Sequence, residues 1–152
     1  MGPRIKVYLD TSVISALFDH RNPERQGLTS SFFEALDRFD VYVSELTLAE
    51  MERTPDRELG REMRDAVKGM NVLEVSPEVE DLAMEYVGQG AVPSSYPEDA
   101  IHIAVASMNG IDYLLSWNFR HLVRRKTRDV VDLVNTFKGM RHISIATPAE
   151  LL

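Results

Sequence analysis

Segments with the pattern of buried strands alternate with segments of helical periodicity along the whole chain of 152 residues. The expected strands cover residues 5–9, 40–43, 71–75, 113–116 and 142–145. The expected helices cover residues 13–18, 29–39, 44–51, 56–68, 76–89, 97–108, 119–123 and 130–137, with a last helical turn from Thr147 and a loop over residues 19–27. This alternation predicts an α/β fold with a mainly parallel five-stranded sheet and right-handed crossovers, because parallel neighbours are joined by crossover helices.

Composition limits the class of protein. With 44% hydrophobic and 27% charged residues, the sequence is typical of a soluble globular protein, and its length suits a single domain over residues 1–152. We find no secretory signal and no apolar run that could span a membrane. The absence of cysteine excludes disulfides and thiolate metal sites and fits a reducing compartment such as the cytoplasm. A net charge of −7 argues against a uniformly basic nucleic-acid-binding surface.

Oxygen-bearing side chains follow several of the expected strands. Asp10 comes directly after the first strand, Glu50 lies on the helix after the second, and Asp99 opens a nearly all-apolar helix. Asn118 follows the fourth strand. Because the carboxyl ends of parallel strands meet at one edge of a sheet, we expect these four side chains to converge there.

Each of these residues also has a simpler explanation. Asp10 can cap the helix that follows it, and Asn118 can cap the turn that begins at Phe119. Asp99 in a first helical turn complements the helix dipole, and Glu50 can be an ordinary exposed residue. The hypothesis of a shared site therefore depends on all four falling at the same edge.

Only one of the two acidic residues in the 44–51 segment is expected in the site. Glu45 and Glu50 are five positions apart, about 140° around a helix, so they are not expected to serve one site. Glu50 lies between apolar neighbours, whereas Glu45 occupies the first turn. We therefore select Glu50.

A cluster of carboxylates without cysteine indicates a particular cofactor. Such carboxylates repel one another unless a cation compensates their charge. Oxygen ligands suit Mg²⁺ or Mn²⁺, and ions of this kind activate water and stabilise the charge that develops in phosphodiester cleavage. The residues therefore favour metal-dependent chemistry on a phosphodiester.

Several motifs together resemble those of a known family. They are Leu9-Asp10-Thr11-Ser12-Val13-Ile14, the helix that carries Glu50, Pro97-x-Asp99-Ala100-Ile101-His102-Ile103-Ala104-x-Ala106, Asp112-Tyr113-Leu114-Leu115-Ser116-Trp117-Asn118, and Thr147-Pro148-x-Glu150-Leu151. In this order they resemble the PIN-domain ribonucleases, whose small single-domain members include the VapC-type toxins of toxin–antitoxin pairs. The resemblance covers essentially the whole chain and implies the three-layer α/β/α PIN-like fold.

The resemblance also implies an activity and its partners. It implies a Mg²⁺- or Mn²⁺-dependent endoribonuclease, often a homodimer, that is inhibited by an antitoxin protein. Asp10, Glu50 and Asp99 match the acidic metal ligands of the family, and Asn118 stands where many members carry a fourth acid. An amide brings no charge, so a second metal ion is in question. Ser116 matches the hydroxyl position just before Asn118, and Thr11 or Ser12 is expected to hold the Asp10 carboxylate or a bound phosphate, so all three are substrate-binding candidates.

Basic residues are concentrated just after Asn118. They are Arg120, Arg124, Arg125, Lys126 and Arg128. This segment is either an RNA-backbone contact or simply a solvated surface. His121 within it can assist substrate binding, whereas His102 is interpreted as a hydrogen-bonded structural histidine rather than a metal ligand.

Two other functions are compatible with the same residues. A degenerate nuclease fold could serve as an RNA- or protein-binding module, and Asn118 is the feature that suggests it. A phosphatase or phosphoacceptor with Asp10 as nucleophile would need a second acid beside it, which Thr11-Ser12 does not supply.

Overall fold

The computed structural model describes residues 3–152, which form one sheet of five parallel strands in the order β3-β2-β1-β4-β5. The strands are β1 Ile5–Leu9, β2 Phe39–Ser44, β3 Asn71–Leu73, β4 Tyr113–Leu115 and β5 Ser144–Ala146. The expected five-stranded parallel sheet is therefore confirmed. Its outer strands are shorter than the sequence pattern indicated.

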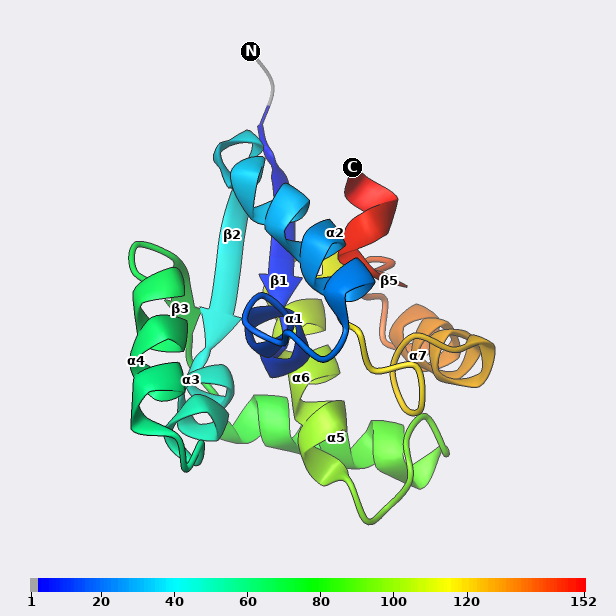
Figure 1. The fold of residues 1–152 in the computed structure, drawn as a ribbon. Helices are drawn as coiled ribbons and strands as arrows, with labels where there is room; N and C mark the ends of the chain where they lie inside the picture. Colours follow the sequence, from blue (N-terminus) through cyan, green and yellow to red (C-terminus); the bar gives the residue numbers. More distant parts are fainter. Residues whose placement is uncertain (1–2) are drawn as a thin grey trace.

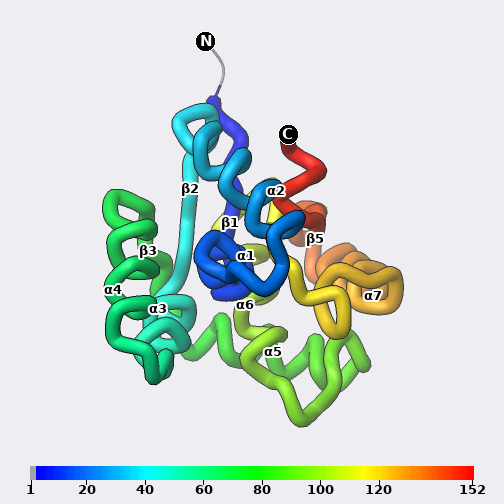
Figure 2. Tube along the Cα trace, viewed as in Figure 1, coloured from blue at the N-terminus to red at the C-terminus, as the bar shows by residue number. Residues whose placement is uncertain are grey.

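Helices cover both faces of this sheet. They are α1 Thr11–Ala16, α2 Pro23–Glu34, α3 Glu45–Glu52, α4 Arg57–Ala66, α5 Pro77–Gly88, α6 Pro97–Met108 and α7 Arg125–Phe137, with 3-10 turns at Leu36–Arg38 and Pro148–Leu151. Figure 1 shows α1 and α2 in front of β1 and α6 behind it, and Figure 2 shows the same path of the chain as a tube. This is the expected three-layer α/β/α arrangement.

The alternating side chains of β1 divide the core into two parts. Val7 and Leu9 pack with residues of α1 to α4, whereas Tyr8 packs with residues of α5, α6 and α7. All three side chains are fully buried, as expected for the central strand of a parallel sheet. The nearly all-apolar α6 is buried along most of its length, which confirms its expected central position.

The structure differs from the sequence prediction in two connecting regions. Residues 23–27 are not a loop: α2 begins at Pro23, with Asn22 accepting the capping hydrogen bond, because proline suits a first helical position. That helix ends at Glu34, well before Phe39. Residues 119–123 form turns instead of a helix, and α7 starts at Arg125.

The strand order determines where a ligand site is expected. The chain runs outward from β1 through β2 to β3, and then returns to place β4 on the other side of β1. The carboxyl ends of β1 and β4 therefore border the point at which the strand order reverses, the usual ligand crevice of open parallel sheets. Within residues 3–152, every helix is too short or too polar to cross a lipid bilayer.

Candidate active site

Asp10 lies at the reversal point, immediately after β1. Its main-chain N–H donates to the carbonyl of Leu115 at the end of β4, and its side chain caps α1 by accepting from the N–H of Val13. Asp10 is thus a helix cap, as in the simpler explanation, and also a carboxylate at the ligand crevice. The two roles are compatible because a carboxylate has about four acceptor sites.

Two serine hydroxyls hold the Asp10 carboxylate. The Oγ of Ser12 lies 2.5 Å from Oδ1, and the Oγ of Ser116 lies 2.6 Å from Oδ2. Burial raises the pKa of Asp10 above its ordinary value, although the charge of His102 and the two serine hydrogen bonds oppose the shift. A bound cation would favour the ionised form of this buried acid.

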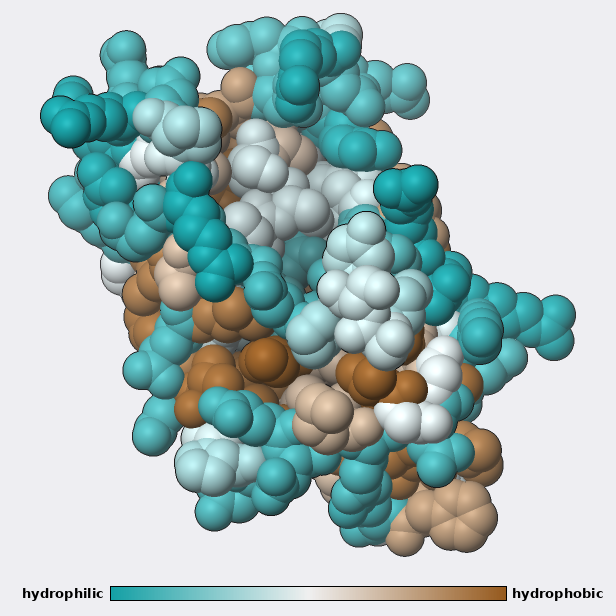
Figure 3. All heavy atoms as spheres, turned by 90° about the horizontal axis from the view of Figure 1, so that it is seen from below, coloured by the Kyte–Doolittle hydropathy of each residue, from teal (hydrophilic) through white to brown (hydrophobic). Residues whose placement is uncertain are grey.

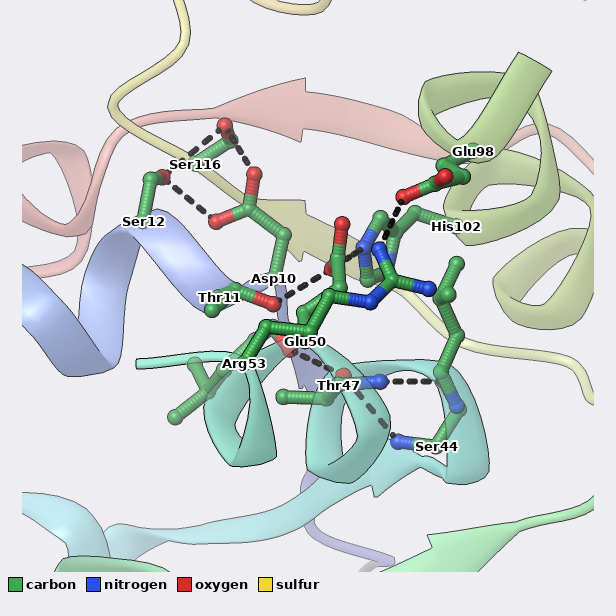
Figure 4. A network of polar contacts seen from close by, with 12 residues as sticks. Asp10, Thr11, Ser12, Ser44, Thr47, Glu50, Arg53, Glu98, His102 and Ser116 are labelled. Atoms are coloured by element: carbon green, nitrogen blue, oxygen red, sulfur yellow. Dashed lines mark hydrogen bonds and ion pairs between the residues drawn. The ribbon is translucent and has the colours of Figure 1, made fainter. Parts of the chain in front are cut away.

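Glu50 projects from α3 toward the same region (Figure 4). Its Oε1 accepts from the Oγ1 of Thr11 at 2.6 Å and lies 2.7 Å from Nε2 of His102. Burial favours protonation of Glu50, but the hydrogen bond and charge of His102 outweigh it and lower the pKa of Glu50 to about 2. Glu50 is therefore an ionised carboxylate at neutral pH.

His102 links Glu50 to a buried polar cluster under β1. Its Nδ1 lies 2.6 Å from the hydroxyl of Tyr8, which also lies 2.8 Å from the Oγ of Ser44. Burial opposes protonation of His102, yet the neighbouring oxygen atoms of Tyr8, Glu50 and Asp10 raise its pKa to about 10. A protonated His102 donates from both ring nitrogens and supplies one positive charge among these acids.

Asp99 lies in the first turn of α6 and is held by the segment that follows β4. Its Oδ2 is 2.9 Å from Nδ1 of His121, and the main-chain N–H of His121 donates to Oδ1 of Asn118 at 3.0 Å. The ring of Tyr96 lies against the His121 ring, with centroids 4.4 Å apart. The amide of Asn118 therefore fixes the turn after β4, as its capping explanation requires.

The structure brings the expected site residues into two hydrogen-bonded groups. Glu50 is bonded to Thr11 and His102. Asp10 is bonded instead to Ser12 and Ser116, and Ser116 leads through Asn118 and His121 to Asp99. No set of three or more histidine, aspartate or glutamate side chains within residues 3–152 is arranged as ready metal ligands. The donor types fit a hard divalent cation, but each carboxylate here has its own hydrogen-bond donor.

Glu45 lies outside this site, as helical geometry predicted. Its Oε1 accepts from the main-chain N–H of Val75 at 2.7 Å. Near Glu50, an ion pair of 3.1 Å joins Arg53 to Glu98 on the surface (Figure 4).

The basic segment after Asn118 is partly structural. The guanidinium of Arg124 donates to the carbonyl of Ala91 and to the Oγ1 of Thr127, and Arg128 donates to the carbonyl of Ile145. Arg120 and Arg125 are exposed on the surface.

Sequence reasoning anticipated Ser12 as a partner of Asp10 but missed the histidine partners of Glu50 and Asp99. The three-residue spacing of Asp99 and His102 placed them on one face of α6, yet it could not reveal that His102 bonds Glu50 on α3. Tyr8 was expected only as a core residue of the strand, and Tyr96 only as part of a loop. In each case the partner comes from an element distant in sequence.

Figure 3 shows the face toward which the arrows of β1 and β2 point in Figure 1. Hydrophilic atoms surround a hollow in this face, and hydrophobic atoms gather below the hollow. The surface at this end of the molecule is thus polar around the hollow and apolar below it.

Comparison with known proteins agrees with this architecture. A family model described as PIN domain matches residues 7–127. No curated protein sequence matches the chain.

Three solved structures have a similar fold. VapC20 of Mycobacterium tuberculosis, described as a Sarcin-Ricin loop cleaving toxin, is 21% identical, with 74% of this chain and 89% of that chain covered and a TM-score of 0.55. A toxin–antitoxin complex from Klebsiella pneumoniae is 18% identical, with 76% and 88% covered and a TM-score of 0.57. VapBC2 from Rickettsia felis, bound to a promoter DNA fragment, is 11% identical, with 93% and 97% covered and a TM-score of 0.56.

At identities this low, the structural similarity shows a common fold and no more. The family model, in contrast, matches most of the sequence itself. The strand order, the acidic residue after β1 and the match over residues 7–127 lead to one conclusion: this chain belongs to the PIN-domain family.

Proposed function

We propose that this protein is a metal-dependent endoribonuclease and the toxin of a toxin–antitoxin pair. The observation that carries the proposal is the Asp10 carboxylate, buried at the reversal point of the sheet and held by Ser12 and Ser116, with ionised Glu50 beside it. The PIN-domain match and the VapC-like fold support ribonuclease activity rather than another metal-dependent reaction.

Asp10, Glu50 and Asp99 would hold Mg²⁺ or Mn²⁺, for which oxygen ligands are suited. When bound, the ion would polarise the scissile phosphate and help to activate water. Because Asn118 adds no charge and its Oδ1 accepts from His121, we propose one tightly held ion rather than two.

The residues around these carboxylates orient them. Ser116 and Ser12 keep both oxygens of Asp10 directed, and Thr11 with His102 fixes Glu50. His102 also offsets negative charge in a site that must accept an anionic phosphate. We propose that Arg120 and Arg125, both exposed, contact the RNA backbone.

Cleavage of RNA by the purified protein, freed of any partner, tests the proposal. We expect cleavage with Mg²⁺ or Mn²⁺ and none with EDTA. Asp10→Ala and Asp99→Ala should each reduce the rate by roughly 100-fold or more, as when a charged group at a reacting centre is lost. Asp65→Ala, which removes an exposed acid on α4, is the matched control. Cleavage that persists in both site variants would disprove the proposal.

We also propose an antitoxin protein as partner and a homodimer as the working form. The structural similarity to two toxin–antitoxin complexes supports the former. Co-expression with the product of an adjacent small reading frame should give a stable complex in which RNA cleavage is suppressed.

A catalytically degenerate binding module is the second candidate. The separate hydrogen-bond partners of Glu50 and Asp99, and the structural role of Asn118, are the observations that favour it. RNA binding without Mn²⁺ affinity or cleavage would support this alternative.

A further inference from the structure

Two exposed aromatic rings lie beside the candidate active site and take no part in the proposed chemistry. Tyr96 precedes α6 and is 50% exposed, and Phe119 follows Asn118 and is 51% exposed. Large aromatic side chains usually bury more of their surface. Their exposure therefore needs an explanation at this end of the sheet.

Tyr96 is connected to the Asp99 side of the site. Its ring packs on the ring of His121, which bonds the Asp99 carboxylate at 2.9 Å. The histidine ring is tilted by 39° to the Tyr96 ring, and half of the Tyr96 surface remains open to solvent.

Phe119 is connected to the Asp10 side of the site. Its ring lies 6.2 Å from the ring of Trp117, whose main-chain N–H donates to the Oγ of Ser12, the same hydroxyl that bonds Asp10. Phe119 is therefore an exposed ring next to the buried Trp117, which is bonded to the support of Asp10.

A cation accompanies this second ring. The guanidinium of Arg25 lies 5.2 Å from the centre of the Trp117 ring and 5.6 Å from that of Phe119. Within residues 3–152, Arg25 forms no ion pair, and the exposed Arg120 follows Phe119 directly. An aromatic face next to free positive charge suits a polyanion with planar bases. A wholly apolar protein segment would instead have to desolvate the guanidinium.

We infer that Tyr96 and Phe119 are positioning residues that stack on unpaired nucleobases on the two sides of the bound phosphodiester. This inference rests on the proposed ribonuclease function. Stacking requires bases that are free of a helix, so the surface should select single-stranded or looped RNA over duplex RNA.

Binding of a ten-nucleotide oligouridylate in EDTA tests the inference without catalysis. Trp117 is the one tryptophan in the sequence, so its fluorescence reports binding next to Phe119. We expect the wild type to bind the single strand at least ten times more tightly than a duplex of the same length. Tyr96→Ala and Phe119→Ala should each weaken binding about 10-fold. Tyr96→Phe and Phe119→Tyr, which keep a ring, should restore it.

Two controls separate stacking from a general structural effect. Phe137→Ala removes a ring that is 84% exposed at the end of α7 and should bind as the wild type does. An oligonucleotide with abasic residues should bind the wild type about 10-fold more weakly than the oligouridylate does. The alanine variants should bind this abasic strand about as well as the wild type does, because the stacking contact between ring and base is already absent.

The outcomes distinguish the inference from the proposed function. If the wild type cleaves RNA and the alanine variants bind and cleave as it does, the inference is wrong and the function stands. If those variants lose only a protein partner, the rings serve protein docking and the inference is again wrong. If the wild type neither binds nor cleaves RNA, both fail.

Discussion

At the scale of single residues, the candidate site is a set of paired polar groups rather than a set of open carboxylates. Asp10 is bonded to two serines, Glu50 to Thr11 and His102, and Asp99 to His121. Hydrogen bonds of this kind orient acids and set their protonation. The partners of each acid should therefore matter for activity almost as much as the acid.

Removal of the Ser116 hydroxyl tests this dependence. Ser116→Ala leaves Oδ2 of Asp10 without its 2.6 Å hydrogen bond, so we expect RNA cleavage to fall by about 10- to 100-fold. Metal-dependent cleavage assays on variant and wild type provide the measurement. Ser144→Ala, at the opposite end of β5 from the acids, is the control, and equal rates for all three proteins would contradict the expected role.

The Glu50–His102 pair should make stability depend on pH in two windows. The pKa of Glu50 falls from 4.5 to about 2, so its stabilisation is present above pH 4.5 and is lost as the pH falls toward 2. The pKa of His102 rises from 6.5 to about 10, so its stabilisation is present below pH 6.5 and is lost as the pH rises toward 10. The pair should stabilise the fold most between these windows.

Urea unfolding of Glu50→Gln at several pH values measures this effect. Near pH 5.5 we expect the free energy of unfolding to drop by about 2 kcal/mol relative to wild type, with smaller differences at pH 3 and pH 9. Glu52→Gln on the same helix removes an exposed acid and should change little. A difference for Glu50→Gln that does not vary with pH would show that no ion pair forms.

At the scale of elements, the sequence predicted most of the sheet and failed in the connections. The apolar residues of β1 and the nearly continuous apolar sequence of α6 are strong signals, so the positions of both elements were predicted well. The start of α2 at Pro23 was missed because a proline among polar residues also indicates a loop. Asp10 was placed at the strand end correctly, but the bond between His102 and Glu50 depends on how α6 packs against α3, which no local pattern contains.

A buried hydrogen-bonded tyrosine joins the helices of one layer. The hydroxyl of Tyr86 on α5 donates to Oδ1 of Asn135 on α7 at 2.5 Å and lies 3.1 Å from the Oγ of Ser107 on α6. Tyr86→Phe leaves the buried Asn135 short of a donor, so we expect a loss of about 1–3 kcal/mol in the free energy of unfolding.

Thermal and urea unfolding check this loss. RNA cleavage should be unchanged at temperatures where the variant is folded, since the Tyr86 hydroxyl bonds Ser107 and Asn135, which are not site residues. Tyr113→Phe is the control, because the Tyr113 hydroxyl forms none of the hydrogen bonds found within residues 3–152. Equal stability of Tyr86→Phe and wild type would mean that the hydroxyl network contributes nothing.

At the scale of the whole molecule, the strand order explains why distant residues meet. Reversal of the order at β1 and β4 brings the residues after both strands together, and the hydrogen bond from Ser116 to Asp10 joins them across 106 positions of sequence. In Figure 1 the C-terminus lies at the end of the molecule away from the arrowheads of β1 and β2. A C-terminal tag should therefore leave the candidate site accessible.

The most direct test of the account is a crystal structure of the protein soaked in MnCl₂, with anomalous scattering used to locate manganese. We predict an anomalous peak within coordination distance of the carboxylate oxygens of Asp10, Glu50 and Asp99, with Glu50 and Asp99 turned from their histidines toward the ion. A crystal in which these acids keep their separate partners and no manganese lies among them would contradict the proposed metal-dependent nuclease.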